Sequence, residues 1–475
     1  MSLFSLPRVM VAAPASGGGK TTAACALLRA LALAGETPAA FKCGPDYIDP
    51  MFHTAVTGAP ARNLDLFLQP AEGVLRTFAR GCRGASLAVL EGVMGYYDGL
   101  GGDTALAGSW HLAQVTRTPV VLVLRCRGMS ALTAAAQVRG LMAFGETARL
   151  LPGEDAAPGR KNSGIAALLL NQISPAAYPA LKATLERETG LPVAGFLPPL
   201  ADCGLESRHL GLVTPDALPD LRDKAERLAA ALRENADLAL LGKIAGEAPP
   251  LEIPDRTTTA RQGNPVPLAV ARDRAFSFYY RDALELLEEA GAELLPFSPL
   301  EDRTIPRGAK GLLLGGGYPE LFARDLSQNQ PMRASVREAV QGGLPTVAEC
   351  GGYLYLNETL SDPEGNPWPM AGVLPGGAKN AGKLRRFGYG TLTAGKSGLL
   401  LDAGESLPAH SFHYWQSDRA GEDFRFQKRD GRCWPEGRQT GTLYAGFPHF
   451  HFGGRPGLAE RFLAKCAQYK REEGM

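Results

Sequence analysis

A glycine-rich loop near the start of the chain limits the fold more than any other feature. Arg8–Ala13 is a run of β-branched and small residues, while Lys20–Ala34 is rich in Ala and Leu and is followed by Gly35. These segments predict a strand and a helix, joined by the loop in APASGGGKTT. A strand, a loop and a helix in this order are typical of a parallel α/β sheet.

The loop has what a nucleoside triphosphate needs. Glycines let backbone N–H groups approach phosphates at a helix N-terminus, Lys20 adds a charge, and Thr21 offers a hydroxyl to magnesium. The loop departs from the G-x-x-x-x-G-K-S/T template, which has glycine where Pro14 stands. A glycine turn that binds nothing is the alternative. The residues predicted to bind ATP are Ser16, Gly17, Gly18, Gly19, Lys20, Thr21 and Thr22.

Carboxylates follow two further apolar segments of the first half. Glu91 comes directly after Leu87–Leu90, so it is expected at the carboxyl edge of the sheet, where open α/β folds bind ligands. Asp46 and Asp49 lie in KCGPDYIDP, a loop punctuated by Gly and Pro. Solvated loop acids are the alternative interpretation.

The chain divides into two α/β halves. Periodicity is lost between about Leu240 and Pro267, where Pro, Gly, Thr and charged residues gather as in a linker. Strand and helix patterns then resume from Pro267. The predicted organisation is a synthetase domain over 1–239, a linker over 240–266 and a second domain over 267–475.

Charge and cysteine usage exclude several classes of protein. Fifty basic and 49 acidic residues give a net charge of +1, so no global field favours nucleic acid or an anionic membrane. The sequence has no stretch of roughly twenty apolar residues, and its eight cysteines form no C-x-x-C pair. A cytoplasmic protein without a zinc site is expected.

Cys350 is a candidate nucleophile in the second half. It follows the apolar segment at Val347 and precedes two glycines, an arrangement typical of a tight strand-to-helix turn that exposes a thiol. Backbone N–H groups of Gly316, Gly317 and Gly351 could stabilise an oxyanion. A buried structural cysteine is the alternative.

Two histidines near the C-terminus could complete an acyl-transfer site. His449 and His451 would lie on one face of a strand, one as base and the other as its orienter. Metal binding is the competing interpretation, but no third ligand with suitable spacing accompanies them, since His410 and His413 are about forty residues away.

These residues together resemble the cobyrinic acid a,c-diamide synthases of corrin biosynthesis, over nearly the whole chain. The segments that carry the resemblance are APASGGGKTT, FKCGPDYIDPMFH, RNLD, VLEGVMGYYDG, SRHLGL, DRAFSFYY, FSPLED, GGGYPE, AECGGYLYL and PHFHF. Some are weak signals alone. In this order and with these spacings they are highly specific.

The resemblance implies a fold and a reaction. It implies an α/β N-terminal P-loop domain similar to dethiobiotin synthetase and an α/β class I glutamine amidotransferase domain. ATP, with Mg²⁺, would phosphorylate the c and then the a acetate of cobyrinic acid, and ammonia from L-glutamine would displace each phosphate. The oligomeric state is open, with a homodimer as one option.

The resemblance also implies roles for single residues. Cys350 would be the nucleophile, His449 its base, and His451 the orienter, where other class I amidotransferases usually carry glutamate. Magnesium would be held by Thr21, Asp46 and Glu91. The acceptor site would be lined by Lys42, Tyr47, Asp49, His53, Arg62 and Arg208.

Three other interpretations compete. A sister enzyme would amidate hydrogenobyrinic acid or nickel sirohydrochlorin. A P-loop switch ATPase of the partitioning type would use a similar loop but has no use for Cys350 and His449. In the third interpretation the C-terminal half is an inert interaction module, which would lack glutaminase activity. Ala409–His413 departs from the Gly-x-Glu-Phe-His pattern, so no role is predicted for His410 or His413.

Overall fold

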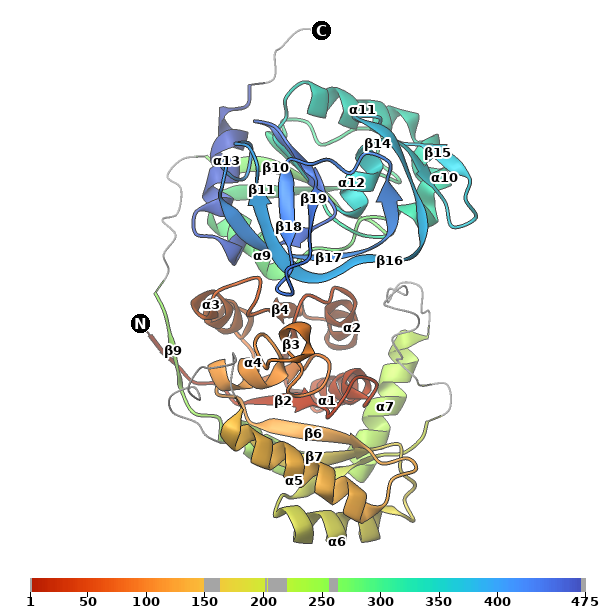
Figure 1. Cartoon of the computed structure of the whole chain (residues 1–475). Helices are drawn as coiled ribbons and strands as arrows, with labels where there is room; N and C mark the ends of the chain where they lie inside the picture. The colour runs from red at the N-terminus through yellow and green to blue at the C-terminus, as the bar shows by residue number, and fades with distance from the viewer. Residues whose placement is uncertain (1, 149–162, 201–202, 204–219, 256–263, 471–475) are drawn as a thin grey trace. The chain divides into compact units, whose positions relative to one another are not determined.

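The structure is a computed structural model, and it describes residues 2–148, 163–200, 203, 220–255 and 264–470. The chain forms two compact units, Met1–Asp255 and Arg256–Met475 (Figure 1). None of the helices within the described ranges is long and apolar enough to cross a membrane.

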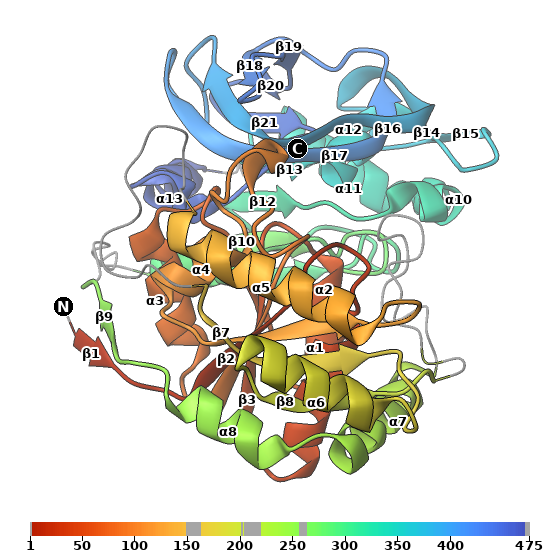
Figure 2. The ribbon, with the colours of Figure 1, turned by 60° about the horizontal axis from the view of Figure 1, so that its bottom comes forward.

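A seven-stranded parallel sheet lies at the centre of the first unit (Figure 2). Its strands, in spatial order, are β4 (Arg62–Leu64), β3 (Pro38–Cys43), β5 (Leu87–Glu91), β2 (Arg8–Ala12), β6 (Val120–Arg125), β7 (Ile165–Asn171) and β8 (Val193–Leu197). The short strands β1 (Ser2–Phe4) and β9 (Leu251–Ile253) pair separately. The α/β prediction for this half is confirmed.

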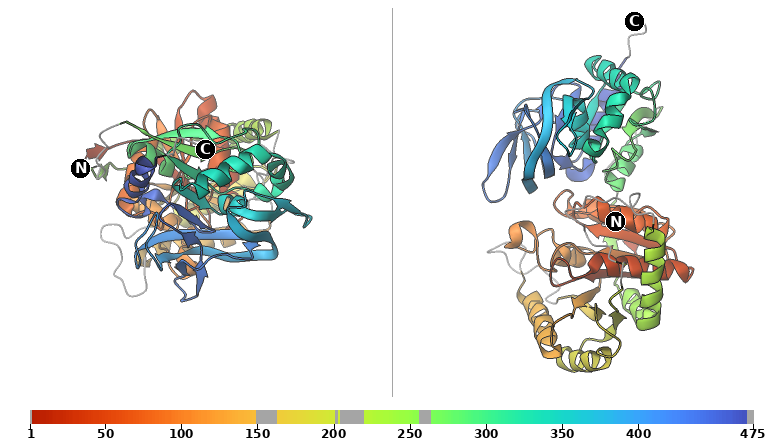
Figure 3. Two further views of the ribbon diagram at one scale, coloured as in Figure 1. Left: turned by 90° about the horizontal axis from the view of Figure 1, so that it is seen from above. Right: turned by 90° about the vertical axis from the view of Figure 1, so that its right-hand side faces the viewer.

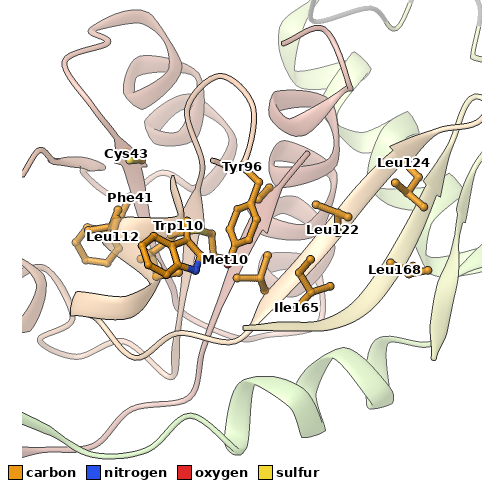
Figure 4. Close-up of a cluster of buried hydrophobic side chains, with 14 of the residues drawn as sticks. Met10, Phe41, Cys43, Tyr96, Trp110, Leu112, Leu122, Leu124, Ile165 and Leu168 are labelled. Carbon is orange, nitrogen blue, oxygen red and sulfur yellow. The ribbon is translucent and has the colours of Figure 1, made fainter. Parts of the chain in front are cut away.

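Helices cover both faces of this sheet, which explains its consecutive apolar residues. In β2, Val9 and Val11 join one core. Met10 and Ala12 join the other, and Figure 4 shows Met10 within it. The first core is covered by α1 (Lys20–Leu33), α2 (Ile48–Thr57), α7 (Leu221–Asn235) and α8 (Leu238–Gly246). The second is covered by α3 (Ala71–Gly81), α4 (Ser109–Val115), α5 (Ala131–Thr147) and α6 (Tyr178–Thr189).

The predicted linker over 240–266 is wrong in its first part. Most of α8 lies in this range, and its side chains Leu241 and Ile244 are buried in a core of the first unit. β9 lies there too and pairs with β1. Proline and glycine interrupt the sequence periodicity, but burial of an apolar stripe is enough to hold a short helix.

The second unit has a six-stranded sheet as its frame. Its strands, in spatial order, are β11 (Ala292–Phe297), β10 (Val266–Ala271), β12 (Gly311–Leu314), β13 (Thr346–Glu349), β21 (Leu443–Gly446) and β20 (Arg438–Gln439). All pairs are parallel except β20 with β21. Its helices are α9 (Arg281–Glu289), α10 (Ala323–Gln328), α11 (Gln330–Gln341), α12 (Gly351–Leu356) and α13 (Leu458–Gln468), with 3-10 turns η3 (Pro319–Phe322) and η4 (Phe452–Gly454).

A second, mostly antiparallel sheet lies in the same unit (Figure 3). Its strands are β14 (Asn357–Ser361), β15 (Pro367–Pro369), β16 (Leu374–Ala394), β17 (Ser406–Ser417), β18 (Phe424–Gln427), β19 (Cys433–Glu436) and β22 (His449–Phe450). β22 pairs with β17 and places His449 opposite His410.

Candidate active sites

Three neighbouring strands of the first unit end at one edge of its sheet. β2 leads into the glycine loop, β3 carries Lys42 near its end, and β5 ends at Glu91. Ligands of open parallel sheets bind at this edge, because strand ends and helix N-termini meet there. The predicted phosphate loop and the predicted carboxylate therefore lie side by side.

The glycine loop adopts left-handed conformations that favour glycine. Gly17 has φ 73° and Gly19 has φ 92°. A Cβ atom on Gly19 would lie 2.0 Å from Nδ2 of Asn171, whose amide donates to Gly18 O at 3.2 Å. Asn171 was not predicted as a site residue. The available signal was its position directly after the apolar run of β7.

Lys20 is the first residue of α1, and its ammonium lies beside the loop. Nζ donates to Ala15 O at 3.3 Å and to Met94 O at 2.5 Å. Burial, followed by the charge of Lys42, lowers the pKa of Lys20 to about 8. Two neutral carbonyls are weaker partners than phosphate oxygens, so the ammonium is suited to exchange them for a nucleotide.

A buried cluster of polar side chains surrounds Glu91. Its Oε1 accepts hydrogen bonds from Thr21 Oγ1 at 2.6 Å and from Lys42 Nζ at 2.7 Å, and its Oε2 lies 2.7 Å from Nε2 of His53. Lys42 Nζ also lies 2.5 Å from Oδ2 of Asp49. The cluster joins α1, α2, β3 and β5 through one carboxylate.

The charges in this cluster compensate one another. Burial would raise the pKa of Glu91, but the Lys42 charge and the His53 hydrogen bond hold it well below its usual range. Burial would lower the pKa of Lys42, but Asp49 and Glu91 raise it. Burial, then the Glu91 charge, raises the pKa of Asp49 to about 7.

The oxygen atoms at this edge fit a magnesium ion. Thr21 Oγ1 and Glu91 Oε1 are hard donors 2.6 Å apart beside the phosphate loop, and Mg²⁺ in nucleotide sites takes one or two protein oxygens with phosphates and water. Asp46 Oδ1 accepts the N–H groups of Ile48 and Asp49 at 2.7 and 2.9 Å. That carboxylate therefore also holds the start of α2.

The residues predicted to line the acceptor site are placed differently from one another. Lys42 and His53 are 4% and 1% exposed and are bound to Glu91, so they support that carboxylate rather than line an open surface. Tyr47 and Asp49 are partly exposed at the start of α2. Arg62 donates to Pro60 O and lies beside Gly81. Arg208 lies outside the described residues.

In the second unit, Cys350 occupies a strained turn between β13 and α12. Its φ is 46° and its ψ is −99°, a conformation that non-glycine residues rarely adopt. Its N–H donates to Gly446 O of the neighbouring strand at 2.8 Å. The predicted strand-to-helix turn is present, and strain of this kind is typical of nucleophile elbows.

The Gly315–Gly317 turn after β12 lies against this elbow. Gly315 O accepts the N–H of Gly352 at 2.9 Å, and Gly317 N lies 3.0 Å from the position that a Cβ on Gly351 would take. The structure thus brings Gly316, Gly317 and Gly351 together beside Cys350.

His449, the first residue of β22, reaches the same place. A Cβ on Gly316 would lie 2.6 Å from Cε1 of its ring, and its Nδ1 lies 3.1 Å from Oε2 of Glu349. Burial would lower the pKa of His449, but hydrogen bonds to Cys350 and Glu349 outweigh it and raise the pKa to about 10. A thiolate beside a buried imidazole that bears a proton forms a pair able to attack a carbonyl.

The expectation that His451 orients His449 is wrong. Nε2 of His451 lies 2.7 Å from Oδ2 of Asp282 in α9, and its Nδ1 accepts the N–H of Gly453 at 2.9 Å. Both ring nitrogens are therefore engaged away from His449. Strand β22 ends at Phe450, so the same-face register assumed for the two histidines does not extend to His451.

His410 and His413 are buried close to His449. His410 lies opposite His449 on β17, and burial lowers its pKa to about 3. The ring of His413 stacks on Phe447 with centroids 3.8 Å apart, and burial lowers its pKa to about 4. Neutral rings of this kind pack as part of the core.

Family models match both halves of the chain. A model described as the CobQ/CobB/MinD/ParA nucleotide binding domain matches residues 9–212. A second model, the CobB/CobQ-like glutamine amidotransferase domain, matches residues 267–457. The two matches cover the glycine loop and Cys350, respectively.

Curated relatives match over nearly the whole length. A cobyrinate a,c-diamide synthase of Priestia megaterium is 36% identical over 98% of this chain and 98% of its own. One from a Synechococcus species is 37% identical over 97% of this chain and 98% of its own. One from Salmonella typhimurium is 38% identical over 96% and 97%.

Proposed function

Since the chain belongs to the cobyrinate a,c-diamide synthase family, we propose that it is a glutamine-dependent ligase of cobalamin biosynthesis. It uses ATP to activate the c and then the a acetate carboxylates of cobyrinic acid, and ammonia from glutamine to convert each into an amide. The chain has two sites: Cys350, whose backbone is strained, beside the buried imidazole of His449, and a phosphate loop beside Glu91. The presence of both on one chain is the observation that carries this proposal.

The glutaminase step uses the second unit. The Cys350 thiolate attacks the side-chain amide carbon of glutamine, and N–H groups of Gly316, Gly317 and Gly351 stabilise the oxyanion that forms. His449, which carries a proton, gives it to the departing nitrogen, so ammonia leaves and a glutamyl thioester remains. Water then hydrolyses the thioester to glutamate and restores the thiol.

The synthetase step uses the first unit. Loop N–H groups and Lys20 hold the phosphates of ATP while an acetate oxygen of the acceptor attacks the terminal phosphorus, giving an acyl phosphate and ADP. Ammonia attacks the acyl carbon and phosphate leaves. Thr21 and Glu91, with Asp46, would hold Mg²⁺, which neutralises developing charge on the phosphates when bound.

The acceptor is proposed to be a polycarboxylated tetrapyrrole. Asp49 and Tyr47 lie at the start of α2 and are partly exposed, and Asp49 is linked to Glu91 through Lys42. Both therefore suit contact with the acceptor. Hydrogenobyrinic acid and nickel sirohydrochlorin remain alternative acceptors. A switch ATPase would leave Cys350 and His449 without a use.

A comparison of acceptors tests this assignment. Cobyrinic acid, hydrogenobyrinic acid and nickel sirohydrochlorin are each incubated with ATP and glutamine, and ADP, glutamate and amide products are counted. Cobyrinic acid is expected to give the highest kcat/KM, with one ADP and one glutamate for each amide. Preference for another macrocycle would reassign the acceptor, and ADP release without any amide would refute the ligase proposal.

A further inference from the structure

Glu349 and Cys350 are adjacent in the chain, yet both contact one imidazole. Oε2 of Glu349 lies 3.1 Å from Nδ1 of His449, and Cys350 also interacts with that ring and raises its pKa. Consecutive residues of a strand point to opposite faces. The left-handed turn at Cys350, with φ 46°, brings the thiol back to the side on which the carboxylate lies.

The hydrogen bond fixes the tautomer of the ring. A carboxylate oxygen only accepts, so Nδ1 of His449 donates to Glu349, and Nε2 is the nitrogen left to exchange a proton with the thiol and the leaving group. Glu349 and His449 are 8% and 3% exposed, so water competes little with this bond. A buried charge-assisted hydrogen bond is among the strong ones.

The other candidate for this role is bound elsewhere. His451 is engaged by Asp282 and by the N–H of Gly453, and its ring packs 5.7 Å from that of Tyr280. It ties the segment after β22 to α9. It is therefore a structural link between two elements rather than a partner of the base.

We propose that Glu349, the residue directly before the nucleophile, is the positioning residue of the glutaminase site and holds His449 in the productive tautomer and orientation. This inference rests on the proposed glutaminase function and adds to it a residue that acts through the base. The turn at Cys350 then positions both the nucleophile, Cys350, and the residue that orients the base, Glu349.

The test compares Glu349→Gln, Glu349→Asp and His451→Gln, each checked for folding by circular dichroism. The alkaline limb of kcat/KM for glutamine reports loss of the His449 proton, since the leaving nitrogen must be protonated. The titratable groups around His449 are Glu349 and Cys350 at the elbow and His410 and His413 on β17, of which only the first is changed.

Glu349→Gln is expected to lower kcat/KM by about a hundredfold or more and to move the alkaline limb down by about one pH unit or more. Glu349→Asp restores most of both. His451→Gln lowers the melting temperature but leaves the limb where the wild type has it. The inference is overturned if the alkaline limb of kcat/KM stays in place in Glu349→Gln, or if it moves equally in His451→Gln.

NMR of histidine ring nitrogens gives a readout that does not need turnover. The His449 signal is identified from a His449→Gln sample, and its titration midpoint is expected to fall in Glu349→Gln. If the wild type hydrolyses no glutamine, the proposed function fails, while this titration still decides whether Glu349 holds the ring. An unchanged midpoint refutes the role of Glu349 alone.

Discussion

The hydroxyl of Thr21 donates a hydrogen bond of 2.6 Å to Oε1 of Glu91. This contact joins the first turn of α1, which follows the phosphate loop, to the end of β5. The same carboxylate binds Lys42 and His53, so Glu91 organises the edge of the sheet where ATP is proposed to react.

Replacing Glu91 with Gln is expected to reduce ATP-dependent amidation by at least about a hundredfold, because a neutral amide cannot balance Lys42 or serve as an anionic ligand. Loss of one partner from a buried ion pair is expected to cost about 3 kcal/mol of stability. ADP and glutamate release are measured separately, and glutamine hydrolysis is expected to continue.

Glu226→Gln is the matched control, since Glu226 pairs with Arg29 at 2.7 Å but is 44% exposed. Exposed ion pairs contribute little to the free energy of unfolding, so this variant should resemble the wild type. Equal losses in both variants would show that Glu91 has no special role.

Gly19→Ala is expected to weaken ATP binding by at least about tenfold, because its Cβ would collide with Asn171 and displace the loop. Gly35→Ala has a similar φ of 87° but open space around the new methyl. Both variants carry the left-handed strain, so a difference between them shows an effect local to the phosphate loop rather than a general loss of stability. Calorimetric ATP titrations with equal affinities would contradict this account.

ATP binding is expected to take up a proton at alkaline pH. Burial and Lys42 lower the pKa of Lys20 to about 8, and bound phosphates favour the charged ammonium, so binding raises it. Above pH 8 the free protein therefore gains a proton at Lys20 when ATP binds, and at pH 7 it gains almost none there. Calorimetry in buffers of different ionisation enthalpy measures this uptake.

Lys20→Arg provides the comparison for that experiment, because arginine stays charged throughout this range. Its ATP binding should take up less than the wild type at pH 9. If uptake at pH 9 is the same in both proteins, the proton does not go to Lys20.

Glu320→Gln is expected to stabilise the second unit at alkaline pH. Burial raises the pKa of Glu320 from 4.5 to about 8, so the folded protein binds more protons than the unfolded chain between these values. Stability therefore falls as pH rises through this window. The variant lacks this loss, and its melting temperature should exceed that of the wild type by about 10 °C or more at pH 9 and match it near pH 4.5. A difference that does not change with pH would contradict the assignment.

Much of the fold could be predicted because its signals are local. Apolar runs followed by helical patterns predicted both parallel sheets, and a carboxylate or cysteine directly after such a run predicted the positions of Glu91 and Cys350. The long strand β16 could not be predicted, since it is rich in glycine and basic residues and is held by pairing with β17, β14 and β18.

The features of the sites that were not predicted depend on contacts in the folded chain rather than on local sequence patterns. Strand alternation would place the side chains of Glu349 and Cys350 on opposite faces, and the positive φ at Cys350 brings them together. His53 and Lys42 were predicted beside the acceptor, but Glu91 needs buried partners and holds both. The likeness of the first unit to dethiobiotin synthetase stays a prediction.

The most direct test follows transfer of isotope-labelled amide nitrogen from glutamine to cobyrinic acid in the presence of ATP, with wild type and Cys350→Ala. The wild type should give labelled a,c-diamide, and Cys350→Ala should give diamide only when ammonium is supplied. Labelled diamide from Cys350→Ala with glutamine, or no amide from the wild type with either nitrogen source, would contradict the account.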